Sequence, residues 1–274
     1  MFTVTDVIAL SAAEWLLAKP SLTAAWGARA EEPAQVADRL QRTLRVVRDL
    51  GGIFDGPWLR SSAEEAVASE APADPAGWTA FVEGLVARDD AGTPAPEWGY
   101  DPRLLARAAT GQPELLVTLD VHAGQSDGDA DRPVNQAALG WTFPGGDPTP
   151  VMEQFDGGAA RETLSRFVEI WRPNSAAVRN IPLIRAQRKA VPFSWPSIGA
   201  ISWLSGDLYD IPDTVPGAVV ERHGQGTLLT VGSVAQPSIR LEDVMPVFDF
   251  LREQGHIGPA PAEQPREPDV STQA

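Results

Sequence analysis

The feature that most constrains the fold of this chain is a series of short strand patterns from its middle onward. Leu115–His122 and Val134–Phe143 are rich in β-branched and apolar residues, and a Gly- and Asp-rich segment separates them. They are predicted to pair as a hairpin with a long loop. Ala218–Arg222 and Thr227–Val231 predict a second hairpin, because a short glycine-containing connection joins them. Strands that follow one another in this way favour an antiparallel sheet.

Helix patterns lie mainly toward the two ends of the chain. Pro33–Leu50 repeats apolar residues at spacings of three and four, and Gly51 ends the pattern. Ala159–Trp171 and Leu241–Gln254 have similar apolar stripes. Other expected elements are helices at Ser61–Ser69 and Ala76–Arg88, a turn at Asp89–Gly92, and strands at Ser175–Ile184 and Ile198–Leu204. The pattern predicts an α+β fold with a mostly antiparallel sheet flanked by helices, in a single compact domain with an irregular acidic segment.

Composition narrows the class of protein. The 274 residues are 43% hydrophobic, enough for one sizeable core. The chain has no cysteine, which excludes disulfides, thiolate metal ligands and a cysteine nucleophile. No apolar run approaches the length of about 18 residues that a membrane span requires, and Met1–Lys19 lacks the basic start of a secretory signal. We therefore expect a cytoplasmic protein without a membrane partner.

The negative charge is concentrated in one part of the chain. Residues 51–160 contain eighteen acidic and five basic side chains, a net −13 of the total −15. This balance argues against a nucleic-acid partner, whose phosphates need basic side chains. A localised negative field suits a protein that meets something basic, whereas acidic runs in general often form a solvated surface. Both interpretations stay open from the sequence.

Asp120 and His122 form the clearest pair of candidate catalytic residues. They end a predicted strand as Asp-Val-His, and the alternation of a strand puts both side chains on one face. The pair could act as an acid and a base in a hydrolase, or supply half of a metal site. The alternative is a hydrogen-bonded histidine at a strand end, because no other histidine lies at ligand spacing.

The acidic segment that begins at Asp127 resembles the start of a calcium-binding loop. An EF-hand loop from this position needs glycine at its sixth position and glutamate at its twelfth. Arg132 and Ala138 occupy these positions, so no metal site is predicted. The chain also lacks a nucleophile elbow, a phosphate-binding loop and a dinucleotide fingerprint, and we predict no cofactor.

Nine tryptophans are spread along the chain, and most are expected in the core. Exposed tryptophans beside acidic residues can anchor a protein interface, because aromatic side chains dominate binding hot spots. Trp58 and Trp98 lie in the irregular acidic region and are our candidates for this role.

Several ordered segments together resemble a known family. They are Trp26–Arg29 followed by Glu31-Glu32, then Gly51–Leu59, Leu119–Gly124, Asn135–Pro144, Trp171–Pro173, Ile198–Ser205 and Thr227–Val231. The series resembles the immunity protein 52 family of bacterial polymorphic toxin systems, over about Ala24 to Ile257. The resemblance implies that residues 1–23 are an N-terminal extension and residues 24–257 an immunity-protein-like domain. The Pro-, Glu- and Ala-rich residues 258–274 are expected to form a disordered tail.

The resemblance also implies a function. Members of the family neutralise a cognate toxin, typically a restriction-endonuclease-like nuclease encoded nearby, and are not known as enzymes. We therefore expect a cytoplasmic immunity protein that binds a toxin with a basic cleft and has no catalytic residue. The candidate toxin contacts are Asp89, Asp90, Asp127, Asp129, Asp131, Trp58 and Trp98. The alternatives are a hydrolase that uses Asp120 and His122, or a non-catalytic scaffolding module; the sequence leaves the oligomeric state open.

Overall fold

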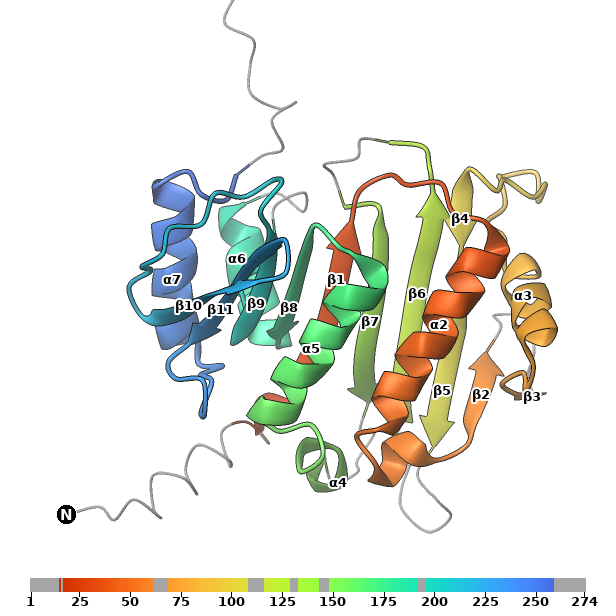
Figure 1. Cartoon of the computed structure of the whole chain (residues 1–274), viewed down its shortest axis with the longest axis horizontal. Helices are drawn as coiled ribbons and strands as arrows, with labels where there is room; N and C mark the ends of the chain where they lie inside the picture. Colours follow the sequence, from red (N-terminus) through yellow and green to blue (C-terminus); the bar gives the residue numbers. More distant parts are fainter. Residues whose placement is uncertain are drawn as a thin grey trace, which may run out of the picture.

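The described strands form one antiparallel sheet with helices on both faces, which confirms the predicted α+β class (Figure 1). The computed structural model describes residues 15, 17–61, 69–107, 116–128, 133–142, 148–191 and 196–258. Within these ranges, no helix is long and apolar enough to cross a membrane.

The strands make an 11-stranded sheet in the order β10-β11-β9-β8-β1-β7-β6-β5-β2-β3, and β4 pairs with β6. Their bounds are β1 (Ser21–Trp26), β2 (Trp58–Ser61), β3 (Ser69–Glu70), β4 (Trp98–Tyr100), β5 (Arg103–Arg107), β6 (Leu116–Gln125), β7 (Asn135–Thr142), β8 (Ser175–Arg179), β9 (Ile201–Ser205), β10 (Ala218–His223) and β11 (Gly226–Val231). Both predicted hairpins, β6–β7 and β10–β11, are confirmed. Since β5 pairs with the first half of β6 and β4 with its end, these two strands follow one another along one edge of β6.

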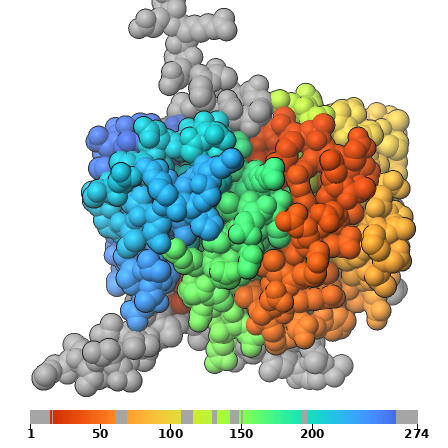
Figure 2. All heavy atoms as spheres, viewed as in Figure 1, coloured from red at the N-terminus to blue at the C-terminus, as the bar shows by residue number. Residues whose placement is uncertain are grey.

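The helices divide between the two faces of the sheet. Their bounds are α2 (Pro33–Arg48), α3 (Pro75–Glu83), α4 (Thr149–Met152), α5 (Gly157–Trp171), α6 (Ile181–Ala190) and α7 (Leu241–Glu253), with a 3-10 helix η1 (Gly52–Asp55). Helices α2 and α5 lie in front of the central strands, whereas α6 and α7 lie behind the strands at the β10 end (Figure 1). In the space-filling view, orange atoms of α2 and green atoms of α5 cover the middle and right of this face, and cyan and blue atoms of later residues cover its left (Figure 2).

Strand β1 explains how the central sheet meets the helices. Its side chains alternate, so that Leu22, Ala24 and Trp26 are buried on the side of α5 while their neighbours are partly exposed. The strand pairs with β7 on one side and β8 on the other. The expected domain boundary at residue 24 therefore falls inside a central strand. Trp15, which precedes it, is also buried and donates through Nε1 to the Phe155 carbonyl at 2.7 Å.

The strand expected over Ser175–Ile184 is only half correct. Strand β8 ends at Arg179, and helix α6 follows directly. Asn180 starts this helix, because its side chain accepts a hydrogen bond from Leu183 N at 3.0 Å, and Pro182 lies in the first turn. Of the helix expected at Ser61–Ser69, residues 62–68 lie outside the described ranges, and the residues at its two ends belong to β2 and β3.

Candidate functional site

Segments from distant parts of the chain meet where β1 ends and α2 begins. The Glu31 side chain is only 2% exposed here and forms ion pairs with Arg29, at 3.3 Å, and with Arg39. Burial lowers the pKa of both arginines, and the pKa of Arg39, which also faces Arg29, falls to about 10. Both guanidinium groups stay charged at neutral pH and compensate the buried carboxylate. We call Trp26, Arg29, Glu31, Arg39 and Trp171 the Arg29 cluster.

Arg29 connects this junction to the end of α5. It donates to the Trp171 carbonyl at 2.9 Å and to the Arg172 carbonyl at 3.4 Å, and so supplies donors that the last turn of a helix lacks. Its guanidinium also lies 5.2 Å from the centre of the Trp26 ring, which stacks on Trp171 at 5.2 Å. Trp171 in turn donates through Nε1 to Thr43 of α2 at 2.9 Å. One arginine thus ties β1, α2 and α5 together.

Strands β6 and β7 hold the same junction from the other side. Asn135 is buried, accepts a hydrogen bond from Gln125 N at 2.9 Å, and donates to the Gly27 carbonyl at 2.7 Å. Gly124 has a φ of +88°, and a Cβ at this position would lie 3.2 Å from the Glu31 carbonyl oxygen, which favours glycine. Several of the segments that resemble the immunity protein 52 family therefore contribute residues to this one junction, where those residues support the fold.

Beside this junction, residues 86–95 and β4 extend the sheet along the end of β6. Ala87 N donates to the Gly99 carbonyl at 2.9 Å, and Asp89 N donates to the Thr93 carbonyl at 3.0 Å, so Asp89 lies at the tip of a hairpin beside β4. On the other side, Ser126 N donates to the Glu97 carbonyl at 2.9 Å. The hairpin, the residue before β4 and the residues after β6 thus each bring a carboxylate to this end of the sheet. We call Asp89, Asp90, Glu97, Trp98, Asp101 and Asp127 the acidic edge.

Most of the acidic edge is open to solvent. Its exposed carboxylates are Asp90, Glu97, Asp101 and Asp127. Trp98 is 39% exposed, a large apolar surface beside these charges. Asp89 is half-buried and accepts hydrogen bonds from Ala91 N at 2.9 Å and Thr93 N at 2.8 Å. These bonds close the predicted turn at Asp89–Gly92 and fix the tip of the hairpin.

A chain of hydrogen bonds through His122 stiffens the acidic edge. His122 Nδ1 lies 2.6 Å from Asp101 Oδ1, and Nε2 lies 2.9 Å from Gln125 Oε1. The Gln125 amide in turn donates to the Asp127 carbonyl at 3.0 Å. Because both ring nitrogens face acceptors, the doubly protonated ring fits best. The hydrogen bond to Asp101 accordingly raises the pKa of His122, against the lowering effect of burial.

The structure does not bring Asp120 and His122 together as an acid–base pair. Asp120 instead forms an ion pair with Arg103 on β5 at 2.8 Å. His122 faces Asp101 and Gln125, so neither ring nitrogen is left to accept a proton from a substrate. This arrangement matches the hydrogen-bonded histidine that the sequence left as the alternative, although β6 continues past His122 to Gln125. Within the described ranges, no group of three or more metal-ligating side chains is positioned to hold a metal ion.

The two tryptophans that were predicted as toxin contacts differ in burial. Trp98 is exposed, as a surface anchor requires, but Trp58 is 1% exposed and donates through Nε1 to the Phe54 carbonyl at 2.8 Å. The proposal of Trp58 as a surface anchor is therefore wrong, because its indole fills the core beside η1. Asp129 and Asp131 lie outside the described residues.

The acidic stretch 51–160 does not form one face. Asp74 and Asp156 cap α3 and α5, where they accept hydrogen bonds from backbone N–H groups. Helix α2 begins beside the Arg29 cluster and ends about 24 Å away at a rise of 1.5 Å per residue. Asp55 lies in η1 just beyond that far end, and Glu153 follows α4, which packs near η1. Only part of the acidic charge therefore belongs to the acidic edge.

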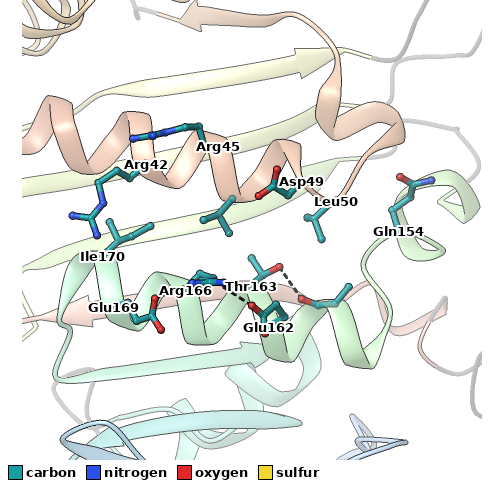
Figure 3. A pocket seen from close by; sticks show the side chains of 12 residues that line it. Arg42, Arg45, Asp49, Leu50, Gln154, Glu162, Thr163, Arg166, Glu169 and Ile170 are labelled. Carbon is teal, nitrogen blue, oxygen red and sulfur yellow. Dashed lines mark hydrogen bonds and ion pairs between the residues drawn. The ribbon is translucent and has the colours of Figure 1, made fainter.

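A groove of about 680 Å³ runs between α2 and α5 (Figure 3). Arg42 and Arg45 of α2 line the groove on one side, together with Asp49, which directly follows α2. Glu162, Arg166 and Glu169 of α5 line the other side. Arg166 bonds to Glu162 at 3.0 Å and to Glu169 at 3.3 Å. Three positive and three negative groups offset one another, as expected for a solvated helix face. Arg39, on the same helix, does not line this groove and pairs instead with the buried Glu31.

Comparisons with known proteins give distant structural likeness alone. No family model matches the chain, and no curated protein matches it. Among solved structures, the chain is similar to a type VI secretion system protein of Pseudomonas aeruginosa, with 13% sequence identity and a TM-score of 0.49. The alignment covers 92% of this chain and 84% of that protein. The resemblance to the immunity protein 52 family stays a hypothesis.

Proposed function

We propose that this protein is an immunity protein that binds and inhibits a bacterial toxin through its acidic edge. The toxin in this proposal is a nuclease domain with a basic cleft. The observation that carries the proposal is the pairing of Glu97 with the Ser126–Asp127 segment, with Trp98 exposed beside it and the Asp89 hairpin on the neighbouring segment. The resemblance described above supports the same function.

The electrostatics of the acidic edge favour a basic partner. Like charges gathered on neighbouring segments repel one another. A cationic surface placed over Asp89, Glu97 and Asp127 would remove this repulsion. A nuclease cleft must attract a polyanion, so an acidic inhibitor can dock there and gain association rate from the same field.

Trp98 and His122 favour binding by means other than charge, namely apolar contact area and rigidity. An exposed tryptophan offers a large area to bury in an interface, and tryptophan is among the commonest hot-spot residues. The bonds from Asp101 through His122 and Gln125 to the Asp127 backbone hold two acidic segments in a fixed relation. A surface that is already rigid loses less entropy when a partner binds.

In this proposal the protein acts in the cytoplasm by covering the toxin and has no catalytic role. Its partner is the toxin, with no nucleic acid or membrane involved. A scaffolding module would instead present a continuous apolar patch. The exposed large apolar side chains among the described residues lie on five separate segments, namely Leu17, Trp98, Ile181, Val234 and Leu241.

The test is co-expression with the toxin encoded beside the gene. We expect the protein to restore growth and to co-purify with the toxin. A variant with Glu97→Gln, Trp98→Ala and Asp127→Asn should lose both properties. The matched control Asp55→Asn with Glu153→Gln, which removes two charges far from the acidic edge, should keep them. Failure of the wild-type protein in both assays would refute the function, whereas full rescue by the triple variant would refute only the surface.

A further inference from the structure

The residue that directly follows α5 has an unusual backbone conformation. Arg172 has a φ of 46° and a ψ of 60°, which lie in the left-handed region. Glycine is the usual residue at such a helix end, because the Cβ of any other residue crowds the neighbouring carbonyl oxygen. Among the described residues, Lys19 is the other non-glycine residue with a positive φ. Outliers of this kind persist where the structure holds them in place, and they are enriched at functional sites.

Main-chain contacts hold this conformation without the Arg172 side chain. Its N–H donates to the Val168 carbonyl at 2.9 Å, its carbonyl accepts a hydrogen bond from Arg29 at 3.4 Å, and the next residue, Pro173, is buried. The side chain itself is exposed, and its guanidinium forms no ion pair with any carboxylate of the described residues. The fold therefore accounts for the turn but not for an arginine at this position.

Arg172 adds a positive charge to a group that already holds two. Arg29 and Arg39 share the Glu31 carboxylate, and their side chains are 31% and 22% exposed. Burial is the main cause that lowers the pKa of both arginines, and the charge of Arg172 contributes, so the three guanidinium groups lie close enough to repel one another. The single carboxylate of Glu31 does not balance all three. A further anion beside Arg172 would reduce this repulsion.

We propose that Arg172 binds a carboxylate on the surface of the toxin, beside the acidic edge. This inference rests on the proposed function and adds a second contact of opposite charge. The backbone brings the two contacts together, because Arg29 N donates to the Gln125 carbonyl at 2.8 Å and Ser126 N to the Glu97 carbonyl at 2.9 Å. A planar guanidinium can hold both oxygens of a carboxylate in two parallel hydrogen bonds.

The two signs of charge favour a protein partner over a nucleic acid. Phosphates drawn to Arg172 would also meet the exposed carboxylates of Glu97 and Asp127, which repel a polyanion. A protein can instead place an acidic side chain next to a basic cleft. Charges of both signs at neighbouring positions also restrict the orientation in which the partner docks, because a reversed orientation puts like charges opposite each other. Arg172 thus gives the toxin-binding surface a specificity that the acidic edge alone lacks.

The experiment compares variants of Arg172 in the full chain, by calorimetry with the toxin and by thermal unfolding. Arg172→Gly removes the charge and suits the left-handed conformation, so it should weaken toxin binding by about tenfold or more and raise the Tm by about 1–3 °C. Arg172→Asn also removes the charge and tolerates a positive φ, and it should weaken binding equally. Arg172→Lys should recover part of the affinity, because it keeps the charge but not the planar fork. The control Arg185→Gln removes an exposed charge from α6 and should leave binding unchanged.

Four results would overturn the inference, and they separate it from the proposed function. Equal toxin binding by the wild type, Arg172→Gly and Arg172→Asn would refute the inference and leave the proposed function intact. A Tm lowered by Arg172→Gly would also refute it, because Arg172 would then support the fold. Binding of a duplex oligonucleotide that both neutral variants lose would assign the site to phosphate instead. If the wild type binds no toxin, the proposed function fails, and this inference fails with it.

Discussion

The Arg29 cluster and the acidic edge lie side by side at one end of the sheet, yet they handle charge in opposite ways. In the Arg29 cluster, the Glu31 carboxylate is 2% exposed and is held between two arginines. In the acidic edge, Glu97 and Asp127 are exposed on adjacent segments, and no ion pair to either is found among the described residues. The backbone joins the two regions directly, because Arg29 N donates to the Gln125 carbonyl at 2.8 Å.

The difference separates charges that support the fold from charges available for binding. A buried ion pair needs its full set of partners, since the loss of one leaves the others uncompensated. An exposed carboxylate loses little when it is neutralised, because water already screens it. Substitutions in the Arg29 cluster should therefore change stability, and substitutions in the acidic edge should change binding.

The largest effect is expected for Glu31→Gln. This change leaves Arg29 and Arg39 close together in a largely buried junction without their carboxylate. We expect a loss of about 3–5 kcal/mol in the free energy of unfolding, measured with urea. The control Asp38→Asn, on the exposed face of α2, should change it by less than about 0.5 kcal/mol. Similar small losses in both variants would contradict a stabilising role for the cluster.

Trp98→Ala should affect toxin binding instead of stability. Truncation of a central tryptophan typically costs about 2 kcal/mol or more of binding free energy. We expect at least this loss in toxin affinity, measured by calorimetry. Leu241→Ala removes another exposed apolar side chain from a different element and should leave affinity unchanged. If both variants bind the toxin as the wild type does, Trp98 is not an anchor.

Neutralisation of Glu97 and Asp127 should affect mainly the rate of association. We expect Glu97→Gln with Asp127→Asn to slow association on the order of tenfold at low salt, and less at high salt, because the long-range field is screened. Asp55→Asn with Glu153→Gln changes the net charge equally but far from the acidic edge. Stopped-flow measurements at two salt concentrations compare the pairs. An equal slowing by both would mean that net charge, not its position, drives association.

The smallest effect concerns His122 and pH. Its pKa is raised in the folded protein, chiefly by the hydrogen bond to Asp101. A histidine whose pKa is raised by folding stabilises the folded state. This stabilisation is fully present below the pKa of the unfolded state, about 6.5, and is lost as the pH rises through the pKa of the folded state. The stability of the wild type relative to His122→Gln should therefore be greatest in mild acid and decrease toward alkaline pH. Asp101→Asn should lower the pKa of His122, measured by NMR titration; an unchanged pKa would contradict the assigned network.

Elements with strong periodicity could be predicted from the sequence, and elements fixed by tertiary pairing could not. The apolar stripes gave α2, α5 and α7 to within two residues at each end, because one buried face determines each helix. Strand β1 has no comparable pattern beyond alternation in Ser21–Trp26, and it is defined by pairing with β7 and β8. Helix α6 is not predicted, because its Asn180-Ile181-Pro182 start lies inside the apolar run Ser175–Ile184, whose composition is typical of a strand.

The candidate site shows the same division. Asp89, Asp90, Asp127 and Trp98 could be proposed from local charge and aromatic content alone. The approach of Glu97 to the Ser126–Asp127 segment depends on strand register, and the pairing of His122 with Asp101 joins residues 21 positions apart. Trp58 illustrates the limit of local reasoning, because nothing in its acidic neighbourhood indicates that the indole packs inward.

Hydrogen exchange of the protein alone and in complex with the toxin tests the central claim most directly. The account predicts slower exchange of backbone amides in residues 85–101 and 122–128 when the toxin is bound. Residues 149–156, beyond the far end of α2, should exchange equally in the two states. Protection confined to that distant segment, with no change in residues 85–101 and 122–128, would contradict the assignment of the acidic edge as the toxin-binding surface.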